Sequence, residues 1–147
     1  MKTWLESLAE YIEERSVSNF EYKLGKLVLT KNLFIHNAPR DSDKEDIVVI
    51  ESDENHGVAV AGDPRRYPVL AALVIAPSWE AMDVRLEEMR TILYGKYGEA
   101  SVYNVPDNSS PVAAIQVKSA GEPKRLLDEF GRCKVIQDYN IIYVSLT

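Results

Sequence analysis

Cysteine, histidine and long apolar runs are all scarce in this chain of 147 residues. The single cysteine, Cys133, excludes a disulfide within the chain and gives no sign of an oxidising compartment. The two histidines, His36 and His56, lie far apart and lack the short spacing of a zinc-binding pair. No apolar run approaches the roughly 18 residues that a membrane span requires. We therefore expect a fold that uses no disulfide, metal, cofactor or membrane.

A segregated basic patch is missing as well. The formal net charge is −6, and a surface of that sign repels nucleic acid. The first residues lead directly into an amphipathic pattern that contains acids, which is not the pattern of a signal peptide. Hydrophobic residues make up 46% of the chain, and at this length roughly 70% of the unfolded surface can be buried. We expect one soluble cytoplasmic domain over residues 1–147.

Recognisable catalytic motifs are also missing. Residues 57–62 (Gly-Val-Ala-Val-Ala-Gly) lack the Gly-Lys-[Ser/Thr] ending of a phosphate-binding loop. A lone cysteine in a predicted strand, such as Cys133, is typical of a small buried hydrophobe, because a nucleophile needs a neighbouring base and a lowered pKa. With no acid–base pair or triad in the pattern, we expect a protein that is not an enzyme.

The strongest pattern that is present covers residues 67–95. Residues 67–76 are an almost unbroken apolar run that ends at Pro77, which predicts a strand buried on both faces. Ser78 is placed to cap a following helix, and Glu80 adds a negative charge to its first turn. The helix has one apolar stripe, formed by Met82, Leu86, Met89 and Leu93, and charged residues that include Arg85 fill much of its remaining surface. Gly95 ends it, so the unit is a strand followed by a helix that folds back over the sheet.

The N-terminal half predicts one more helix and two short strands. Residues 3–15 place Leu5, Leu8 and Ile12 on one face of a helix. Residues 20–30 are ambiguous and are either helical or an irregular segment packed on the sheet. Residues 32–36 and 47–51 are rich in β-branched and aromatic residues, and the polar loop between these strands favours an antiparallel hairpin.

The C-terminal half predicts a long loop and further strands. Residues 94–111 contain glycine, asparagine and proline and predict an exposed loop, which is followed by a strand over residues 112–118. Residues 123–131 predict a short helical turn. Residues 132–146 predict a long strand whose apolar phase slips near Gln137 and Asp138, so we expect a bulge or a hairpin-like break there, with the strand end directed towards a neighbouring subunit.

The order of these elements predicts an α+β fold. We expect a mostly antiparallel sheet of about four to five strands, with the N-terminal helix and the central amphipathic helix packed on one face. Residues 57–62 are expected to add a small strand or a flap.

Acidic residues concentrate between positions 41 and 54, and they are the most unusual local composition in the chain. The group consists of Asp41, Asp43, Glu45, Asp46, Glu51, Asp53 and Glu54. An EF-hand calcium loop is excluded, since Asp46 stands where glycine is required and Ser52 where the bidentate glutamate belongs. The simplest interpretation is a solvated loop and strand edge. The alternative is a surface past which DNA moves without binding.

Two further features are candidates for contacts with partners. Trp79, at the start of the central helix, is either a hydrophobic staple or an exposed interface residue. Arg65 and Arg66 form an isolated basic pair, which is usually solvated.

The succession of these segments resembles the tail terminator proteins, also called tail completion or minor capsid proteins, of long-tailed bacteriophages. Segments along nearly the whole chain carry the resemblance: residues 5–12 (Leu-Glu-Ser-Leu-Ala-Glu-Tyr-Ile), 32–39 (Asn-Leu-Phe-Ile-His-Asn-Ala-Pro), 46–50 (Asp-Ile-Val-Val-Ile), 67–69 (Tyr-Pro-Val), 127–132 (Leu-Asp-Glu-Phe-Gly-Arg) and 139–141 (Tyr-Asn-Ile). Residues 58–61 and 98–111 depart from the family pattern.

The resemblance implies a structural virion protein without catalytic residues. Such a protein forms a ring, typically a hexamer, that caps the tail tube, ends tube polymerisation and offers a joining surface to the head-side connector. DNA passes through the lumen without specific binding, and the acidic residues between positions 41 and 54 would then face that lumen. The expected location is the tail or neck of the virion, and the host cytoplasm during assembly.

Three alternatives stay open at this point. The first is another neck or head-completion protein, and the second is a small metal-dependent hydrolase that uses the acidic loop. The third is a bacterial interaction module with no role in a virion.

Overall fold

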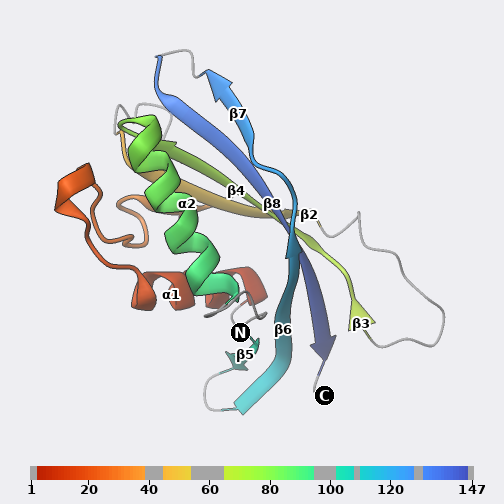
Figure 1. Ribbon diagram of the computed structural model, residues 1–147. Coiled ribbons are helices and arrows are strands. Elements are labelled where there is room, and N and C mark those ends of the chain that lie inside the picture. Colours follow the sequence, from red (N-terminus) through yellow and green to blue (C-terminus); the bar gives the residue numbers. More distant parts are fainter. Residues whose placement is uncertain are drawn as a thin grey trace.

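The computed structural model describes residues 3–38, 45–53, 65–94, 102–107, 110–127 and 131–145. Within these ranges, two α-helices, one 3-10 turn and one mixed sheet of eight strands make up the fold (Figure 1). In chain order they are α1 (Trp4–Arg15), η1 (Phe20–Tyr22), β1 (Leu33–Ile35), β2 (Ile47–Asp53), β3 (Arg65–Arg66), β4 (Val69–Ala76), α2 (Trp79–Tyr94), β5 (Val102–Asp107), β6 (Ser110–Ala120), β7 (Lys124–Leu127) and β8 (Cys133–Ser145).

Strand β8 is the centre of the sheet, whose main strand order is β1-β2-β4-β8-β6-β5. On one side β8 pairs with β3 and β4, which continue the same register, since Arg66 lies opposite Tyr143 and Val69 opposite Asn140. On the other side it pairs with β6 and β7. All of these pairs are antiparallel, and only β1 and β2 run parallel among the described strands.

Both helices begin at side-chain caps. The hydroxyl of Thr3 accepts a hydrogen bond from the Glu6 amide at 3.1 Å and so caps α1. The hydroxyl of Ser78 accepts one from the Ala81 amide at 3.1 Å, as the sequence predicts for α2. Pro77 ends β4 immediately before this cap, which makes the reversal from strand to helix short.

The two helices lie on the same face of the sheet, which we call the inner face (Figure 1). Their apolar stripes meet alternate residues of the strands, and the resulting main core is almost fully buried. From the helices it includes Leu5, Leu8, Ile12, Met82, Met89 and Leu93, and from the strands Val48, Ile50, Leu70, Ala72, Val74, Val117, Val135, Tyr139 and Ile141. The predicted α+β class, with both helices on one face of a mostly antiparallel sheet, is confirmed.

A smaller apolar cluster lies on the opposite face, which we call the outer face. It consists of Ile47, Val49 and Ile75, with Phe34, Ala38 and Leu73 packed against it. The sequence predicted that β4 is buried on both faces. Its inner face is fully buried, but Val69, Ala71 and Leu73 on the outer face are only half-buried.

The sheet has more strands than the predicted four to five. Strand β5 lies within residues that we expected to form a loop, and it is paired with β6 in a hairpin in which Asp107 opposes Ser110. Strand β7 replaces the expected helical turn, because residues 124–127 pair with residues 133–136 of β8. In both places pairing with the next strand along the chain overrides the local preference.

The expected hairpin between β1 and β2 is also wrong. The two strands are parallel, with Leu33 opposite Val48 and Ile35 opposite Ile50. The backbone turns at His36, which has a positive φ of 70° and is followed by a long connection. A connection of about a dozen residues is enough to return the chain to the same end of the sheet.

Strand β8 is continuous, and the expected bulge or break at Gln137 and Asp138 is absent from this described strand. Gln137 occupies an inward position between Val135 and Tyr139, and it is buried like them. Its amide nitrogen donates to the carbonyl oxygens of Gly121 and Asp138. The register irregularity lies in the neighbouring strand, where Lys118 is the extra residue between Val117 and Ser119 of β6.

The ambiguous segment over residues 20–30 is irregular. It forms the 3-10 turn η1 and then packs Leu24 and Leu27 into the main core. The predictions for residues 57–62 and for Gly95 lie outside the described residues.

Candidate interaction surfaces

Arg85 is the most buried charged residue that the structure describes, with 1% of its side chain exposed. Its two terminal nitrogens reach the Asp46 carboxylate at 2.7 Å, the Glu88 carboxylate at 2.6 Å and the Gly25 carbonyl oxygen at 2.8 Å. Two carboxylates and a carbonyl oxygen therefore compensate the guanidinium charge. We call these groups the Arg85 cluster.

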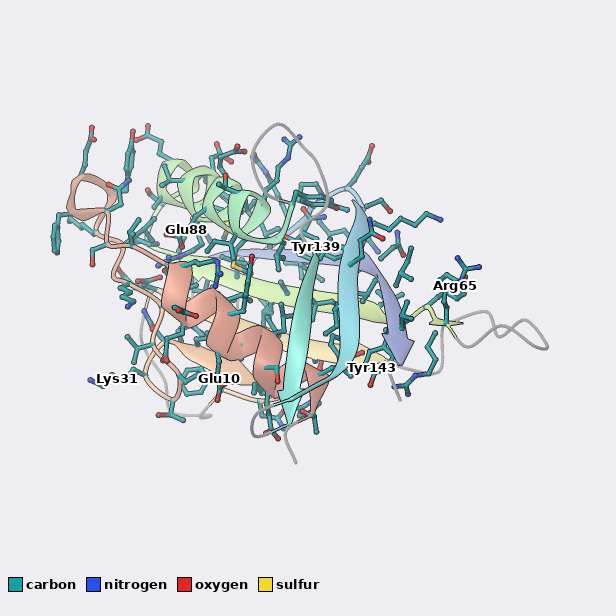
Figure 2. All side chains as sticks on the ribbon, turned by 90° about the horizontal axis from the view of Figure 1, so that it is seen from below. Glu10, Lys31, Arg65, Glu88, Tyr139 and Tyr143 are labelled. Atoms are coloured by element: carbon teal, nitrogen blue, oxygen red, sulfur yellow. The ribbon has the colours of Figure 1, made fainter. Side chains whose placement is uncertain are left out.

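The Arg85 cluster joins four segments that are distant in sequence. Glu88 also accepts hydrogen bonds from the Ser16 hydroxyl and the Val17 amide, where α1 ends. Asp46 also accepts one from the Gly25 amide at 2.9 Å. The cluster thus fixes the end of α1, the irregular segment and the start of β2 against α2, and Glu88 lies at that junction (Figure 2).

The acidic residues between positions 41 and 54 do not share one described surface. Asp46 belongs to the Arg85 cluster, with only 18% of its side chain exposed. Glu45 is exposed, and Glu51 is exposed on the outer face of β2. Asp53 ends β2. The remaining members, Asp41, Asp43 and Glu54, lie outside the described residues.

The other predicted contact residues lie at two different places. Arg65 and Arg66 are exposed on β3, beside the C-terminal part of β8, and the Arg66 guanidinium lies 4.1 Å from the centre of the Tyr143 ring. Figure 2 places Arg65 at the end of the molecule remote from η1. Trp79 is half-buried against the main core, and the Arg125 guanidinium lies 5.0 Å from its ring centre. Trp79 therefore has both a packing role and a polar neighbour.

An exposed apolar tip lies next to an open groove on the inner-face side. Phe20 is 86% exposed and Val17 is 66% exposed, and we call these two residues and the segment between them the tip. The tip follows α1 and projects away from the sheet (Figure 1). The neighbouring groove has a volume of about 560 Å³, and its apolar lining comes from Val17, Leu24, Val84 and Ile92. Arg15 and Glu87 also line it.

A band of apolar side chains crosses the outer face. In one row the register aligns Phe34, Val49, Leu73 and Ile136, and the row ends at Lys124. In the adjacent row it aligns Ile47, Ile75, Lys134 and Leu126. Directly opposed residues of neighbouring strands lie on the same face, so these side chains are contiguous. We call this band the outer stripe; it consists of Phe34, Ile47, Val49, Leu73, Ile75, Ile136 and Leu126.

The outer stripe is most accessible at its β7 end, where Leu126 is 39% exposed. Next to it, a hollow of about 150 Å³ has a floor formed by Val49, Ala71, Leu73 and Ile136, with His36, Glu51 and Lys134 at its sides. An apolar floor with charged sides is typical of a surface that contacts another protein.

Two tyrosines form a buried pair between α2 and β8. The rings of Tyr94 and Tyr139 have their centres 6.2 Å apart, and Tyr139 is labelled in Figure 2. Burial raises the pKa of the Tyr139 hydroxyl far above its usual value, with a smaller contribution from Tyr94. Burial also raises the pKa of Tyr94, an effect that the positive charge of Arg90 partly offsets.

No cluster of three or more metal-binding side chains occurs among the described residues. Cys133 lies half-buried at the start of β8, and His36 is exposed where β1 ends. Neither described helix has both the length and the apolar character that crossing a bilayer requires.

Comparison with known proteins adds no family to these observations. No protein-family model matches the chain, and no curated protein matches it. The resemblance to tail terminators therefore stays a prediction from the sequence.

Sequence reasoning missed three structural features. The charge of Arg85 suggested a solvated position, but Arg85 alternates with Met82 and Met89 on the buried side of α2. The helical spacing was the signal that could have placed it inwards. The tip and the accessible end of the outer stripe at Leu126 depend on which apolar residues the fold leaves exposed, and the sequence does not contain that information.

Proposed function

We propose that this chain is a structural protein of a long-tailed phage, a tail terminator that assembles as a ring on the end of the tail tube. One observation carries the proposal: apolar side chains are exposed at two places of different shape, at Val17 and Phe20 in the tip and at Leu126, the accessible end of the outer stripe on the opposite face. Accessible apolar groups of this kind favour protein contacts.

Two different surfaces suit a ring better than a two-fold dimer. A two-fold interface uses the same patch on both subunits, whereas a head-to-tail interface joins one patch to another and generates rings when the rotation closes. We propose that the tip of one copy contacts the outer stripe of the next. A projecting aromatic such as Phe20 is well suited to insert into an apolar surface of a neighbour.

The remaining surfaces would then contact the tube, the head-side connector and DNA. The exposed acid Glu45 is suited to a lumen through which a duplex passes, because like charge opposes binding. Glu51 borders the hollow beside the outer stripe, so it would belong to the ring interface. Asp46 is not suited to this role, because its carboxylate is held by Arg85. The protein would act by capping: one side of the ring matches the tube rim, and the other lacks the surface that a further tube ring needs.

A tube-capping assay tests this function. Purified tail tube protein is allowed to polymerise with and without this chain, and tube lengths and ends are observed by negative-stain electron microscopy. The proposal predicts shorter tubes that carry a ring at one end. Tubes of unchanged length with bare ends would contradict it.

Two variants test whether the tip takes part in ring formation. Phe20→Asp places a charge in the tip and is expected to abolish the rings. Gln116→Asp is the matched control, since Gln116 is an exposed strand residue outside both surfaces. If both variants cap tubes equally well, the tip has no part in the ring.

A further inference from the structure

The groove beside the tip has an acidic edge on its α2 side. Helix α2 forms this wall with two parallel rows of side chains, because residues four positions apart lie on one side of a helix. Val84, Glu88 and Ile92 form the more buried row. Asp83 and Glu87 belong to the exposed row, one helical turn apart. A partner that enters the groove therefore meets two carboxylates along this edge.

The chain itself compensates the charge of the exposed row only in part. Glu88 is paired with Arg85 at 2.6 Å and adds no free charge to the wall. Asp83 has the Arg125 guanidinium at 3.9 Å, but both side chains are well exposed, and such a pair contributes little. Glu87 forms no ion pair with any described residue. Like charges one turn apart destabilise a helix, so a cation from another chain would be favourable here.

Arg15 also lines the groove, but it belongs to the opposite wall. Its guanidinium lies 3.5 Å from the centre of the Tyr11 ring and 3.5 Å from the Glu14 carboxylate, and both of these residues are on α1. The positive charge of the groove is thus held on the α1 side. A basic partner group is therefore attracted to the α2 side.

The accessible end of the outer stripe has the complementary charge. Leu126 and Lys134 are directly opposed in the register of β7 and β8, so they lie on the same face of the sheet. Lys124 lies on that face as well, two residues before Leu126 in β7. The exposed Leu126 is thus flanked by two lysines, and neither lysine forms an ion pair with a described residue.

We propose that this end of the outer stripe enters the groove of a second copy, with Lys124 and Lys134 facing Asp83 and Glu87. Leu126 then contacts the apolar lining of the groove. The apolar stems of the lysines lie along the same lining, while their ammonium groups reach the carboxylates. The inference rests on the proposed head-to-tail ring, and it names the groups that fix the orientation of the ring interface.

A binding measurement between two chains that can form only one interface tests this contact. Leu126→Asp retains the tip and the groove, whereas Phe20→Asp retains the outer stripe, and sedimentation velocity gives the dissociation constant of their dimer. Glu87→Lys is added to the first chain and Lys124→Glu to the second. Either reversal alone is expected to weaken the dimer by about fivefold or more, because it places like charges together. Both reversals together should restore the affinity to within about twofold, because opposite charges meet again.

Glu122→Lys in the groove-bearing chain is the matched control. Glu122 is exposed and does not line the groove, so the same change in net charge should leave the affinity unchanged. Equal losses for Glu87→Lys and Glu122→Lys would show general charge attraction and would overturn the proposal. An affinity that stays low when both reversals are combined would overturn it as well.

The outcomes separate this contact from the ring itself. If the two chains form a dimer and Glu87→Lys leaves its affinity unchanged, the ring stands, the groove has a different occupant and the inference is wrong. If the two chains form no dimer before any reversal is added, the head-to-tail interface is wrong, and this contact is wrong with it.

Discussion

Arg85 carries a positive charge inside the protein, and its neighbours compensate that charge from three segments of the chain. Asp46 and Glu88 are themselves mostly buried, with 18% and 16% of their side chains exposed. Transfer of such charges out of water is costly, and the ion pairs recover much of that cost only when their geometry is complete. Removal of one member therefore leaves the others buried and uncompensated.

Arg85→Met tests this dependence. Loss of the guanidinium leaves two mostly buried carboxylates without a cationic partner, and we expect the free energy of unfolding to fall by about 3–5 kcal/mol. Urea denaturation followed by circular dichroism measures the change. The matched control is Arg90→Met, an exposed position on the same helix, which should change stability by about 0.5 kcal/mol or less. A loss below about 1 kcal/mol for Arg85→Met would mean that the cluster is not needed for stability.

Burial of the Tyr139 hydroxyl predicts a loss of stability at alkaline pH. Its pKa is raised in the folded protein above the usual value of 10.0, so its stabilising contribution is complete below that pH. As the pH rises above about 10, the unfolded chain ionises first and the free energy of unfolding falls, by up to about 1.4 kcal/mol per pH unit for one group. Tyr139→Phe should reduce this alkaline slope. Parallel slopes for the variant and the wild type between about pH 9 and 11 would contradict the burial of the hydroxyl.

At the scale of elements, β4 and α2 form one unit that is specified locally. The apolar run, Pro77 and the cap at Ser78 stand in direct succession, so strand, turn and helix follow from neighbouring residues. The sequence predicted this unit well for that reason. It also predicted α1, because the spacing of Leu5, Leu8 and Ile12 fits only a helix.

Ser78→Ala measures the contribution of the cap. The Ala81 amide loses its acceptor at 3.1 Å, and we expect a loss of about 1 kcal/mol in the free energy of unfolding. Thr91→Ala, an exposed substitution inside the same helix, serves as control and should not destabilise the protein. The cap is unimportant if the two variants have the same stability.

The elements that the sequence did not predict depend on how neighbouring strands pair. The spacing of Leu126, Leu127 and Phe130 predicts a helical turn, yet residues 124–127 form β7 because β8 offers a free edge beside them. The direction of β1 depends on the path of the following connection, which local preference does not specify. Gln137 interrupts an apolar pattern, but its hydrogen bonds to Gly121 and Asp138 let it occupy an inward position.

The candidate surfaces likewise depend on contacts that the local sequence does not specify. Asp46, the residue before β2, is 39 residues from its partner Arg85 along the chain, and no local pattern connects the two. The acidic segment was visible in the sequence, but its division between a buried ion pair and exposed positions follows only from the fold. Leu126 is apolar in the sequence, and its exposure on the outer stripe follows from the register of β7.

Across the whole molecule, two different surfaces lie on opposite sides of one sheet. Phe20 is the most exposed large hydrophobic side chain on one side, and Leu126 marks the accessible end of the outer stripe on the other. If the tip of one copy contacts the stripe of the next, a charge in either surface blocks growth of the ring. Phe20→Asp and Leu126→Asp should each be monomeric and fully folded, because both side chains lie outside the main core.

Mixing these two variants tests the head-to-tail arrangement most directly. Each variant retains the surface that the other lacks, so a mixture can form one intact interface and then cannot extend. Sedimentation velocity is expected to show monomers for each variant alone, a one-to-one dimer for the mixture and a larger closed assembly for the wild type. A mixture that stays monomeric while the wild type assembles, or a variant that forms dimers alone, would contradict the head-to-tail ring.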